Sequence, residues 1–524
     1  MNNKITRLII VESPSKAKTL KKILKNGYEI EASVGHIRDL PKNELGVDVN
    51  NNFLPKYVIA EDKKKIVNNI RKKVKLASEL YLATDPDREG EAISWHIIEA
   101  ISPNVPIKRL VFHEITKEAI MDAFNKTRDI DISLVKAQES RRILDRLFGY
   151  LVSKKLWLNV KRNLSAGRVQ SPAIKLIVDL EKKRSAFKEN EFWKIKGIFL
   201  ASDLSFEANL IKIGNNKIAT SKDFDKHTGN LKSKNSIVLD SQKVEKLTKS
   251  LLLDKWVVET VEQKPKISNP SPPFITSTLQ QEGVRKLRMT SRRVMSVAQR
   301  LYEKGLITYM RTDSITLSSE AINAARSEII KHFGDEYLPN TPRQYKSKVK
   351  NAQEAHEAIR PAGSLFKNPN NLQNKLESDE FKLYELIWKR TIASQMKSAK
   401  ILQTNAKITN GNEIFEAIGK VIQFPGYFKI YVHGRDDKTS ERDDQEKTLP
   451  ILKNGQSLLA QSFQPEQRFT KPWARFTEAT LIKELENLGI GRPSTYASII
   501  SVISNRGYAD IVNKRFFPTD RGKL

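Results

Sequence analysis

The chain has 524 residues, more than a single hydrophobic core usually holds, so several domains are expected. Its 91 Lys and Arg residues outnumber 61 Asp and Glu residues, and the formal charge of +30 favours a polyanionic partner such as nucleic acid, although surface solvation would also explain it. The complete lack of cysteine excludes disulfides, thiol nucleophiles and cysteine-bound zinc.

Motifs that the sequence lacks exclude further classes of function. The sequence contains no nucleotide-binding loop of the form G-x-x-x-x-G-K-[ST], no HExxH pair and no GxGxxG turn after a strand. A reaction driven by ATP or NAD is therefore not expected. The opening residues, MNNKITRLIIVES, contain an apolar run shorter than a signal peptide or a membrane span requires. We therefore expect a cytoplasmic protein that binds neither a membrane nor a nucleotide.

In chain order, the first 145 residues alternate strand-like and helical patterns. Residues 8–11 form an apolar run before a helical pattern at 16–24, and residues 80–84 form another before a helical pattern at 91–101. This alternation predicts an α/β domain whose active groups lie at the carboxyl ends of its strands.

The remaining chain alternates helical and strand-like stretches. Residues 130–183 are mostly helical, and residues 192–261 are strand-like. The segment KPKISNPSPPF, residues 264–274, predicts a linker because proline interrupts helices and strands. A helical block follows to about residue 400, and a second strand-like stretch, 401–432, leads into the charged segment GRDDKTSERDDQEK, an expected exposed loop. If the two strand-like stretches pair, the helical block lies at the end of a β arm and could swing.

An acidic segment follows the strand predicted at residues 80–84. It contains Asp85, Asp87 and Glu89, and residues two apart project to one side of an extended chain. Three converging carboxylates repel one another unless a hard cation lies among them, and Mg²⁺ prefers oxygen ligands. A solvated turn that caps the next helix explains the same spacing slightly better when the segment is taken alone.

Glu12 favours the metal interpretation. It ends the first predicted strand, where a parallel sheet would place it beside Asp85, and the helix that follows begins with Lys16 and Lys18. Cations at a helix N-terminus beside a metal form a phosphate site. A Glu at a strand end followed by D-x-D-x-E resembles the Toprim domain of topoisomerases and bacterial primases. SVGHIRDLP, which contains His36, resembles the type IA topoisomerase version of that domain.

Tyr309 lies at the end of an apolar run, two residues before Arg311. A tyrosine in such a place is far more often a core residue, but LITYMRTDS closely resembles the active-site motif of type IA DNA topoisomerases. That resemblance implies that Tyr309 attacks the phosphodiester. The chemistry agrees, because a phenol with a pKa of about 10 needs nearby positive charge and a proton acceptor. Arg311 would stabilise the charge that develops on the phosphorus centre.

Two further segments resemble strand-binding motifs of that family. ESRRILDRLFGY places Arg141 and Asp145 one helical turn apart, and the resemblance assigns them to the strand upstream of the cut. An ordinary ion pair explains the same spacing. LSAGRVQSPAIKL contains Gly167 and Arg168 at a predicted helix start, where a hinge and a phosphate contact are expected.

Two more motifs lie in the second half of the chain. LGIGRPSTYASIISVISNRGY places Arg492, Ser494 and Thr495 at a predicted helix N-terminus, with Pro493 near the first helical position. Such a segment can hold a phosphate, cap its helix, or do both. NAQEAHEAIRP makes His356 a DNA-binding candidate through its resemblance to the family pattern, whereas alone it would indicate an ordinary helix histidine.

These motifs run from residue 8 to about residue 520 in the order found in bacterial type IA DNA topoisomerases, and the chain is identified as a member of that family. The resemblance implies a multidomain fold, in which a Toprim α/β domain joins a toroidal core of helical domains and a β arm. The implied segments are a Toprim domain (1–145), a helical base (146–190 and 470–524), a β arm (191–265 and 401–469) and a helical domain with the tyrosine (266–400).

The family reaction relaxes negatively supercoiled DNA without ATP, through transient single-strand cleavage, a 5′-phosphotyrosine, strand passage and religation. The resemblance implies a nucleoid-associated monomer that binds single-stranded segments of such DNA. It implies catalytic roles for Tyr309, Glu12, Arg311 and Lys16. It implies Mg²⁺ as cofactor, held by Glu12, Asp85, Asp87 and Glu89.

Three alternatives stay open. A Toprim primase would explain the carboxylates and the charge but gives LITYMRTDS no role, and a single-strand-binding protein explains only the charge. A type III decatenase is the nearer alternative, although DPDREGEA and SVGHIRDLP resemble type I more. Many bacterial members continue into zinc ribbons or basic repeats, so we expect a fragment or a minimal form that retains cleavage but not necessarily processive relaxation.

Overall fold

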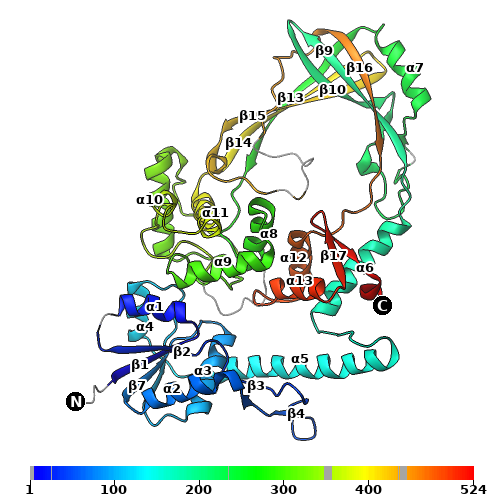
Figure 1. The fold of residues 1–524 in the computed structure, drawn as a ribbon. Coiled ribbons are helices and arrows are strands. Elements are labelled where there is room, and N and C mark those ends of the chain that lie inside the picture. The colour runs from blue at the N-terminus through cyan, green and yellow to red at the C-terminus, as the bar shows by residue number, and fades with distance from the viewer. Residues whose placement is uncertain (1–4, 25, 234, 347–356, 435, 437–444) are drawn as a thin grey trace.

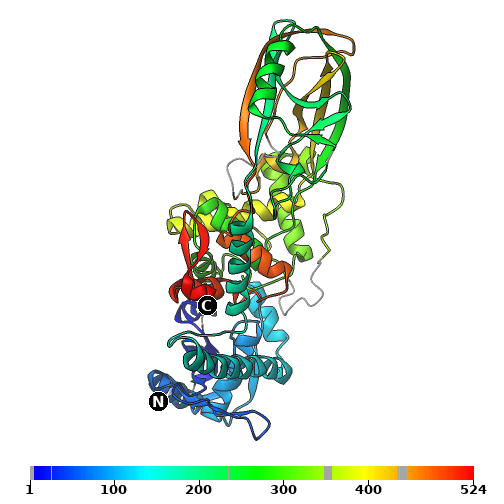
Figure 2. The same ribbon diagram turned by 90° about the vertical axis from the view of Figure 1, so that its right-hand side faces the viewer.

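The structure of the protein, a computed structural model, describes residues 5–24, 26–233, 235–346, 357–434, 436 and 445–524. A β arm arches away from an assembly of helices, and an α/β domain lies at the other side of that assembly (Figure 1). A view turned by 90° shows an elongated molecule with the arm and the α/β domain at opposite ends (Figure 2). Within the described residues, no helix combines the length and apolar character needed to cross a membrane.

The amino-terminal domain is built on a parallel sheet with the strand order β2-β1-β7-β8. Its elements are β1 (Ile5–Val11), α1 (Pro14–Ile23), β2 (Tyr28–Ala32), β3 (Arg38–Asp39), β4 (Val47–Asp48), β5 (Leu54–Pro55), β6 (Val58–Ile59), α2 (Lys64–Val74), β7 (Ala77–Leu82), α3 (Arg88–Ile101), β8 (Ile107–Arg109) and α4 (Lys117–Asn125). Ile9 and Val11 pack with α1 and α4, whereas Leu8 and Ile10 pack with α2 and α3. The apolar run is uninterrupted because helices cover both faces of the sheet.

Two segments far apart in the sequence form one helical base. They comprise α5 (Ile132–Asn159), α6 (Gln170–Ala186), α12 (Glu478–Asn487), α13 (Tyr496–Asn505), β17 (Ala509–Val512), β18 (Arg515–Pro518) and α14 (Asp520–Lys523). Ala173 and Ile177 of α6 share a buried core with Leu481 and Leu485 of α12 and with Ile500 of α13. The long helix α5 extends from this base beside the α/β domain (Figures 1 and 2).

The β arm is one sheet drawn from both strand-like stretches of the sequence and from a further strand, β16, that lies beyond the second stretch. Its strands are β9 (Glu191–Ala201), β10 (Leu204–Ile213), β11 (Asn216–Ile218), β12 (Ser236–Ile237), β13 (Trp256–Ser268), β14 (Ala399–Thr409), β15 (Glu413–Phe424) and β16 (Ser457–Phe469). Their order is β12-β11-β10-β15-β14-β13-β16-β9, and a further pairing of β9 with β10 closes the sheet. Aromatic rings of Phe199, Trp256, Phe415 and Phe463 fill its interior.

The predicted linker at residues 264–274 is wrong for its first five residues, because β13 continues to Ser268. Pro265 lies within this strand and pairs with Leu402 of β14. Beyond Trp256 and Val257, β13 has no ladder with β16, so one side of the strand is an edge. Proline is tolerated in an edge strand because its missing N–H faces no partner.

Two other details of the arm differ from the sequence prediction. A helix, α7 (Ser241–Leu251), interrupts the first strand-like stretch. The second stretch ends as a strand at Phe424, and residues 426–429 form a 3₁₀ turn instead of extending the strand to residue 432. Most of the charged segment that follows lies outside the described residues. The division of the chain into six segments stays a prediction.

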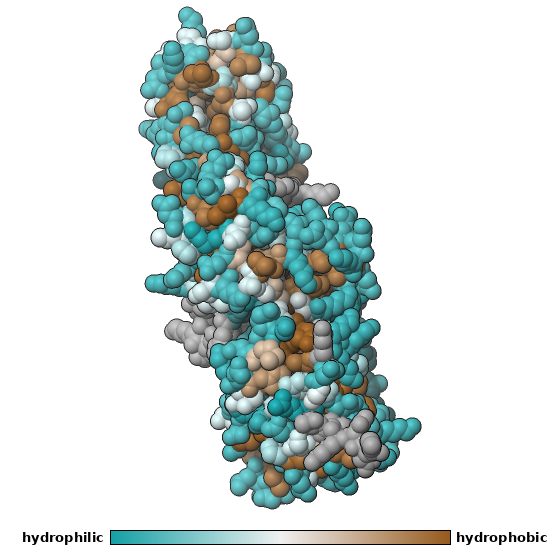
Figure 3. Space-filling view, turned by 90° about the vertical axis from the view of Figure 1, so that its left-hand side faces the viewer, coloured by the Kyte–Doolittle hydropathy of each residue, from teal (hydrophilic) through white to brown (hydrophobic). Residues whose placement is uncertain are grey.

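The helical block between β13 and β14 packs directly on the α/β domain. It contains α8 (Thr276–Leu287), α9 (Ser291–Glu303), α10 (Ser319–Phe333) and α11 (Ser378–Gln395). A single buried core includes Ile9 and Val11 of β1 together with Leu301, Tyr302 and Tyr309 of this block. The face in Figure 3 is mostly hydrophilic, with apolar residues in small groups, as in most folded proteins.

Candidate active site

Glu12 and Asp85 lie at the carboxyl edge of the parallel sheet. Glu12 follows β1 directly, Asp85 comes three residues after the end of β7, and the two strands are neighbours. The backbone N–H of Asp85 donates a hydrogen bond to Oε2 of Glu12 over 2.7 Å. The edge of the sheet therefore brings together two carboxylates that are 73 residues apart.

Lys16 places a positive charge between these two carboxylates. It lies in the first turn of α1, and its Nζ atom is 3.1 Å from Oε1 of Glu12 and 3.0 Å from Oδ1 of Asp85. Its side chain is fully buried, with Nζ over the rings of Phe112 and Tyr302. Burial acts to lower the pKa of Lys16, but the negative charges of Asp85 and Glu12 have the larger effect and raise that pKa above its usual value. Lys16 is consequently a permanent cation of the site.

The two carboxyl groups beside Lys16 have opposite pKa shifts. Burial and the nearby charge of Asp85 raise the pKa of Glu12 well above its usual value, against the opposing effect of Lys16. Burial also acts to raise the pKa of Asp85, but Lys16 and the hydrogen bond with Glu12 lower it overall. Such a pair separates into a group able to give a proton and a group that stays ionised.

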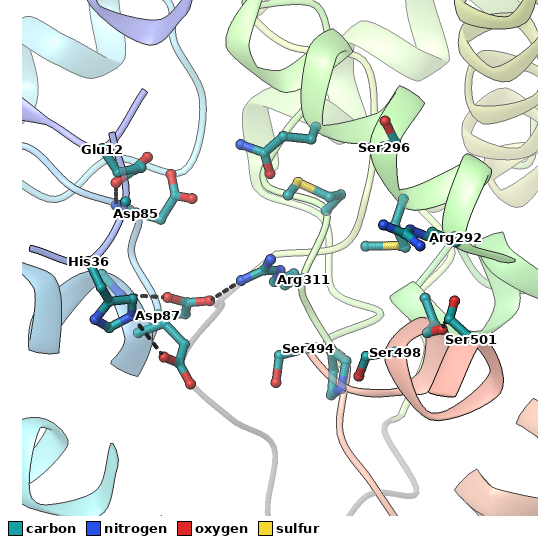
Figure 4. A pocket seen from close by; sticks show the side chains of 18 of the residues that line it. Glu12, His36, Asp85, Asp87, Arg292, Ser296, Arg311, Ser494, Ser498 and Ser501 are labelled. Atoms are coloured by element: carbon teal, nitrogen blue, oxygen red, sulfur yellow. Dashed lines mark hydrogen bonds and ion pairs between the residues drawn. The ribbon is translucent and has the colours of Figure 1, made fainter. Parts of the chain in front are cut away.

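Asp87 joins the α/β domain to Tyr309. Its Oδ1 accepts the backbone N–H of Gly90 and caps α3, while its Oδ2 accepts the Tyr309 hydroxyl over 2.7 Å. The guanidinium of Arg311 lies 3.4 Å from the same Oδ2 (Figure 4). Burial, followed by the charges of Asp87 and Asp85, raises the pKa of Tyr309 well above its usual value, so the phenol keeps its proton in this arrangement. Sequence reasoning gave Asp87 only a metal role and missed this contact.

Buried contacts hold the turn that carries Asp85. A Cβ atom at Gly90 would lie 2.1 Å from the carbonyl oxygen of Asp85, so glycine is required there. The fully buried guanidinium of Arg109 donates to the carbonyl oxygens of Asp85 (2.7 Å), Leu82 and Thr84 (both 3.0 Å). Arg109 at the end of a three-residue strand carries no local signal of this role, so the sequence could not identify it.

Glu89 lies in the first turn of α3, where His36 and Gln138 hold its carboxylate. The distances to Oε2 are 3.4 Å from Nε2 of His36 and 3.2 Å from the amide of Gln138, and Arg141 lies 3.8 Å from Oε1. Burial acts to raise the pKa of Glu89, but the hydrogen bond and charge of His36, aided by Arg141, lower it to about 2. Across the part of the chain that the structure describes, no three Asp, Glu, His or Cys side chains are arranged to hold a metal ion.

Several predicted strand-binding residues contact one another in pairs, and one of them, Arg141, also lies beside Glu89. Arg141 donates to the hydroxyl of Ser494 over 3.4 Å, and Asp145 accepts from Nε of Arg168 over 3.0 Å. Gly167 precedes Arg168 just before α6, and a Cβ atom there would lie 3.1 Å from the side chain of Gln170. His36, Arg141 and Asp145 also line a cavity of about 270 Å³. His356 lies outside the described residues.

The carboxyl-terminal motif starts its helix later than the sequence predicted. Helix α13 begins at Tyr496, so Pro493, which was expected near the first helical position, lies three residues before it. The Thr495 hydroxyl accepts the backbone N–H of Arg492 over 2.8 Å and makes no capping bond to α13. This local turn satisfies the backbone and leaves Arg492 and Ser494 lining the cavity that also contains Asp87 and Arg311.

The cavity of about 830 Å³ that contains Glu12, Asp85 and Arg311 has two contrasting walls (Figure 4). One wall comes from the α/β domain and carries all of its carboxylates. The other comes from α9 and α13, and sequence reasoning missed it, although the spacing of Ser498 and Ser501 puts both hydroxyls on one face of a helix. Its polar residues are Arg292, Ser296, Gln299, Ser498, Ser501 and Asn505.

Comparisons with known proteins agree with one another. The family model described as DNA topoisomerase matches residues 129–524, and the Toprim domain model matches residues 7–115. DNA topoisomerase 1 of Synechococcus elongatus is 50% identical over 98% of this chain and 60% of its own length, and that of Mycolicibacterium smegmatis is 49% identical over 98% and 58%. The chain thus spans about 60% of the length of these curated relatives.

Solved structures include a similar protein. Full-length topoisomerase I from Thermotoga maritima superimposes with a TM-score of 0.81 at 38% sequence identity, and the match covers 98% of this chain and 80% of that one. The likeness therefore extends from the parallel sheet to the helical base.

Proposed function

The chain belongs to the bacterial type IA DNA topoisomerase family, and we propose on this basis that it relaxes negatively supercoiled DNA by transient single-strand cleavage, without ATP. The observation that carries the proposal is the contact of the Tyr309 hydroxyl with Asp87, beside Arg311 and at a cavity that three arginines and two carboxylates line. A buried tyrosine whose hydroxyl meets a carboxylate and a guanidinium has both the proton acceptor and the positive charge that phenol chemistry needs.

In the proposed reaction, the Tyr309 oxygen attacks the phosphorus atom and the bond from phosphorus to the 3′ oxygen breaks. The phenolic proton passes to Asp87, and the leaving 3′ oxygen takes a proton from Glu12, whose raised pKa suits a general acid. Arg311 and Lys16 stabilise the charge on the non-bridging oxygens. The products are a 5′-phosphotyrosine and a free 3′ hydroxyl. The reverse reaction reseals the strand, so no ATP is consumed.

Mg²⁺ is the proposed cofactor. The donors along the acidic wall are carboxylate oxygens, whose chemistry fits Mg²⁺, and Glu12, Asp85, Asp87 and Glu89 would hold it. Because no three of these described side chains are arranged around one point, they would have to turn toward a common ion to bind it. When bound, the ion would neutralise these carboxylates and align the two strand ends for religation. Lys16 supplies part of that neutralisation itself, since its ammonium group lies between Glu12 and Asp85.

The proposed partner is a single-stranded segment of negatively supercoiled DNA, bound by a monomer at the nucleoid of the cytoplasm. The formal charge of +30 supports a polyanion as partner. The part of the strand upstream of the cut would follow the cavities beside α5, α6 and α13. The proposed contacts there are His36, Arg141, Asp145, Gly167, Arg168, Arg492, Ser494 and Thr495. His356, which lies outside the described residues, is a further proposed DNA contact.

The test is incubation with single-stranded oligonucleotides carrying a radiolabel at either end, followed by denaturing gels. A 3′ label should be transferred to the protein, whereas a 5′ label should remain on a shortened free strand. A primase or a single-strand-binding protein forms no covalent adduct with the oligonucleotide. If this protein formed no adduct either, the proposal would be refuted. Plasmid relaxation measured against decatenation then separates a type I from a type III activity.

A further inference from the structure

Three adjoining cavities form one path past Asp87, the residue that accepts the Tyr309 hydroxyl. The cavity of about 330 Å³ beside α5 shares Arg88 and Arg492 with a small middle cavity of about 30 Å³. The middle cavity shares Asp87, Arg311 and Ser494 with the cavity of about 830 Å³. A strand that enters beside α5 therefore crosses the contact of Asp87 with Arg311 and continues between α9 and α13.

The far end of this path has donors without acceptors. Arg292 is exposed and makes no hydrogen bond or ion pair with any residue that the structure describes, whereas its neighbour Arg293 is paired with Asp379 over 2.8 Å. The Ser296 hydroxyl, one helical turn further along α9, likewise has no hydrogen bond within the described chain. Every carboxylate that lines the cavity lies on the opposite wall. An anion in this cavity is thus attracted to the α9 side and repelled from the other.

The two ends of a cleaved strand would be held by different parts of the protein. The 5′ phosphate stays on Tyr309, and the ring of Tyr309 packs on Tyr302 of α9 with ring centroids 5.2 Å apart. The free 3′ hydroxyl stays near Glu12 on the α/β domain. Nucleotides that continue beyond the 5′ phosphate must therefore lie on the tyrosine side of the break, where α9 lines the cavity.

We infer that the wall formed by α9 and α13 binds the nucleotides on the 3′ side of the cleaved bond, with Arg292 and Ser296 contacting the first or second phosphodiester beyond it. This inference rests on the proposed function, because it needs a tyrosine-bound 5′ phosphate to set the direction of the strand. Arg292 is a binding residue in this assignment. A guanidinium and a hydroxyl are common partners of phosphate oxygens.

The experiment combines a protein change with a DNA change, in a Tyr309→Phe background that leaves the oligonucleotide intact. One phosphodiester at a time, first or second beyond the mapped cleavage site, is replaced by an uncharged methylphosphonate. Arg292→Gln should weaken binding of the unmodified strand about tenfold, as loss of a charge-assisted hydrogen bond does. On the strand with the critical methylphosphonate, the same substitution should cause no further loss.

Two controls make the result specific. Arg293→Gln, the adjacent arginine that is paired with Asp379, should respond to the methylphosphonate as the Tyr309→Phe parent does. A methylphosphonate on the 5′ side of the cleavage site should lower the DNA affinity of Arg292→Gln and of its parent by the same factor. The inference would be overturned if Arg292→Gln and the methylphosphonate lowered DNA affinity by independent factors that multiply at both 3′ positions. It would also be overturned if the two changes failed to multiply only when the methylphosphonate lies on the 5′ side. Failure of the proposed function would differ from either outcome, because the protein with Tyr309 intact would then form no covalent adduct with the oligonucleotide.

Discussion

The two walls of the 830 Å³ cavity differ in how their polar groups are held. On the acidic wall, Glu12, Lys16 and Asp85 are mutually bonded and mostly buried, and Asp87 is bonded to Tyr309. On the opposite wall, Arg292 is exposed and makes no bond to any described residue. Bond breaking benefits from charges fixed in advance in a dry environment, whereas strand binding needs groups that remain hydrated until the DNA arrives.

This difference has energetic consequences. Removing one partner of a buried ion pair leaves an uncompensated charge and costs roughly 3 to 5 kcal/mol. An exposed substitution usually changes stability by no more than about 0.5 kcal/mol. Changes to the acidic wall should therefore affect both folding and chemistry, and changes to the opposite wall should affect only DNA binding.

The largest expected effect is that of Tyr309→Phe, which removes only the hydroxyl that donates to Asp87. The covalent adduct should disappear entirely, because no other group replaces the nucleophile. Affinity for single-stranded DNA should stay nearly unchanged, because binding is mostly electrostatic. The adduct is measured on denaturing gels and the affinity by fluorescence anisotropy. An adduct in this variant would show that another residue is the nucleophile.

Next in size is the joint replacement of Asp85 and Asp87 by Ala, which should abolish Mg²⁺-dependent plasmid relaxation. The remaining carboxylates seldom suffice for an ion that keeps its own waters. The double replacement of Asp122 and Asp179, both on exposed helix surfaces, is the matched control and should relax plasmid normally. Full relaxation by the first variant would instead favour a solvated acidic turn with no metal role.

A smaller effect is expected for Glu12→Gln, which cannot give a proton as the carboxylic acid does. Cleavage should slow by about 10²- to 10⁴-fold while DNA affinity changes little. The raised pKa of Glu12 sets the sign of the pH dependence. The acid form is the active one, so the parental rate should fall as pH rises through that pKa, and the variant should lack this fall.

The measurement for Glu12 is single-turnover cleavage of a labelled oligonucleotide across a pH series, without added metal. Parental rates in the variant at every pH would make Glu12 a structural or metal-binding residue. A uniform slowing with the same pH profile would mean that another group supplies the proton.

The smallest expected effect concerns salt. The logarithm of DNA affinity should fall with the logarithm of salt concentration by about 0.7 for each phosphate neutralised on a single strand. Arg292→Gln should reduce this slope by about 0.7, whereas Tyr309→Phe should leave it unchanged. Titrations at several salt concentrations measure both slopes. A flat parental profile would mean that the charge of +30 only keeps the protein soluble.

The fold class expected from the sequence is confirmed. Apolar runs such as residues 8–11 and the short helical patterns between them indicated a parallel α/β domain, which the sheet order verifies. The pairing of two distant strand-like stretches into one arm was conditional in the sequence and is observed. Pro265 was wrongly assigned to a linker, because proline is excluded from a central strand but not from an edge strand. Only the pairing of β13 with its neighbours shows that Pro265 lies at an edge.

Sequence by itself determined which chemical groups are available and which end of a strand carries them. Strand periodicity and parallel order put Glu12 and Asp85 at one edge, and the LITYMRTDS motif identified Tyr309 as the candidate nucleophile. The placement of Glu12 and Asp85 is confirmed, because alternation and strand order depend on local properties that a short stretch of chain encodes, whereas the role of Tyr309 stays a prediction.

Only the tertiary structure decided which of these groups meet. It joined Asp87 to Tyr309 across 222 residues, placed Arg109 behind the acidic turn and left Arg292 unpaired within the described chain. It also turned Glu89 toward His36. Contacts of this kind depend on how separately folded segments pack, and no periodicity within one segment records the position of another.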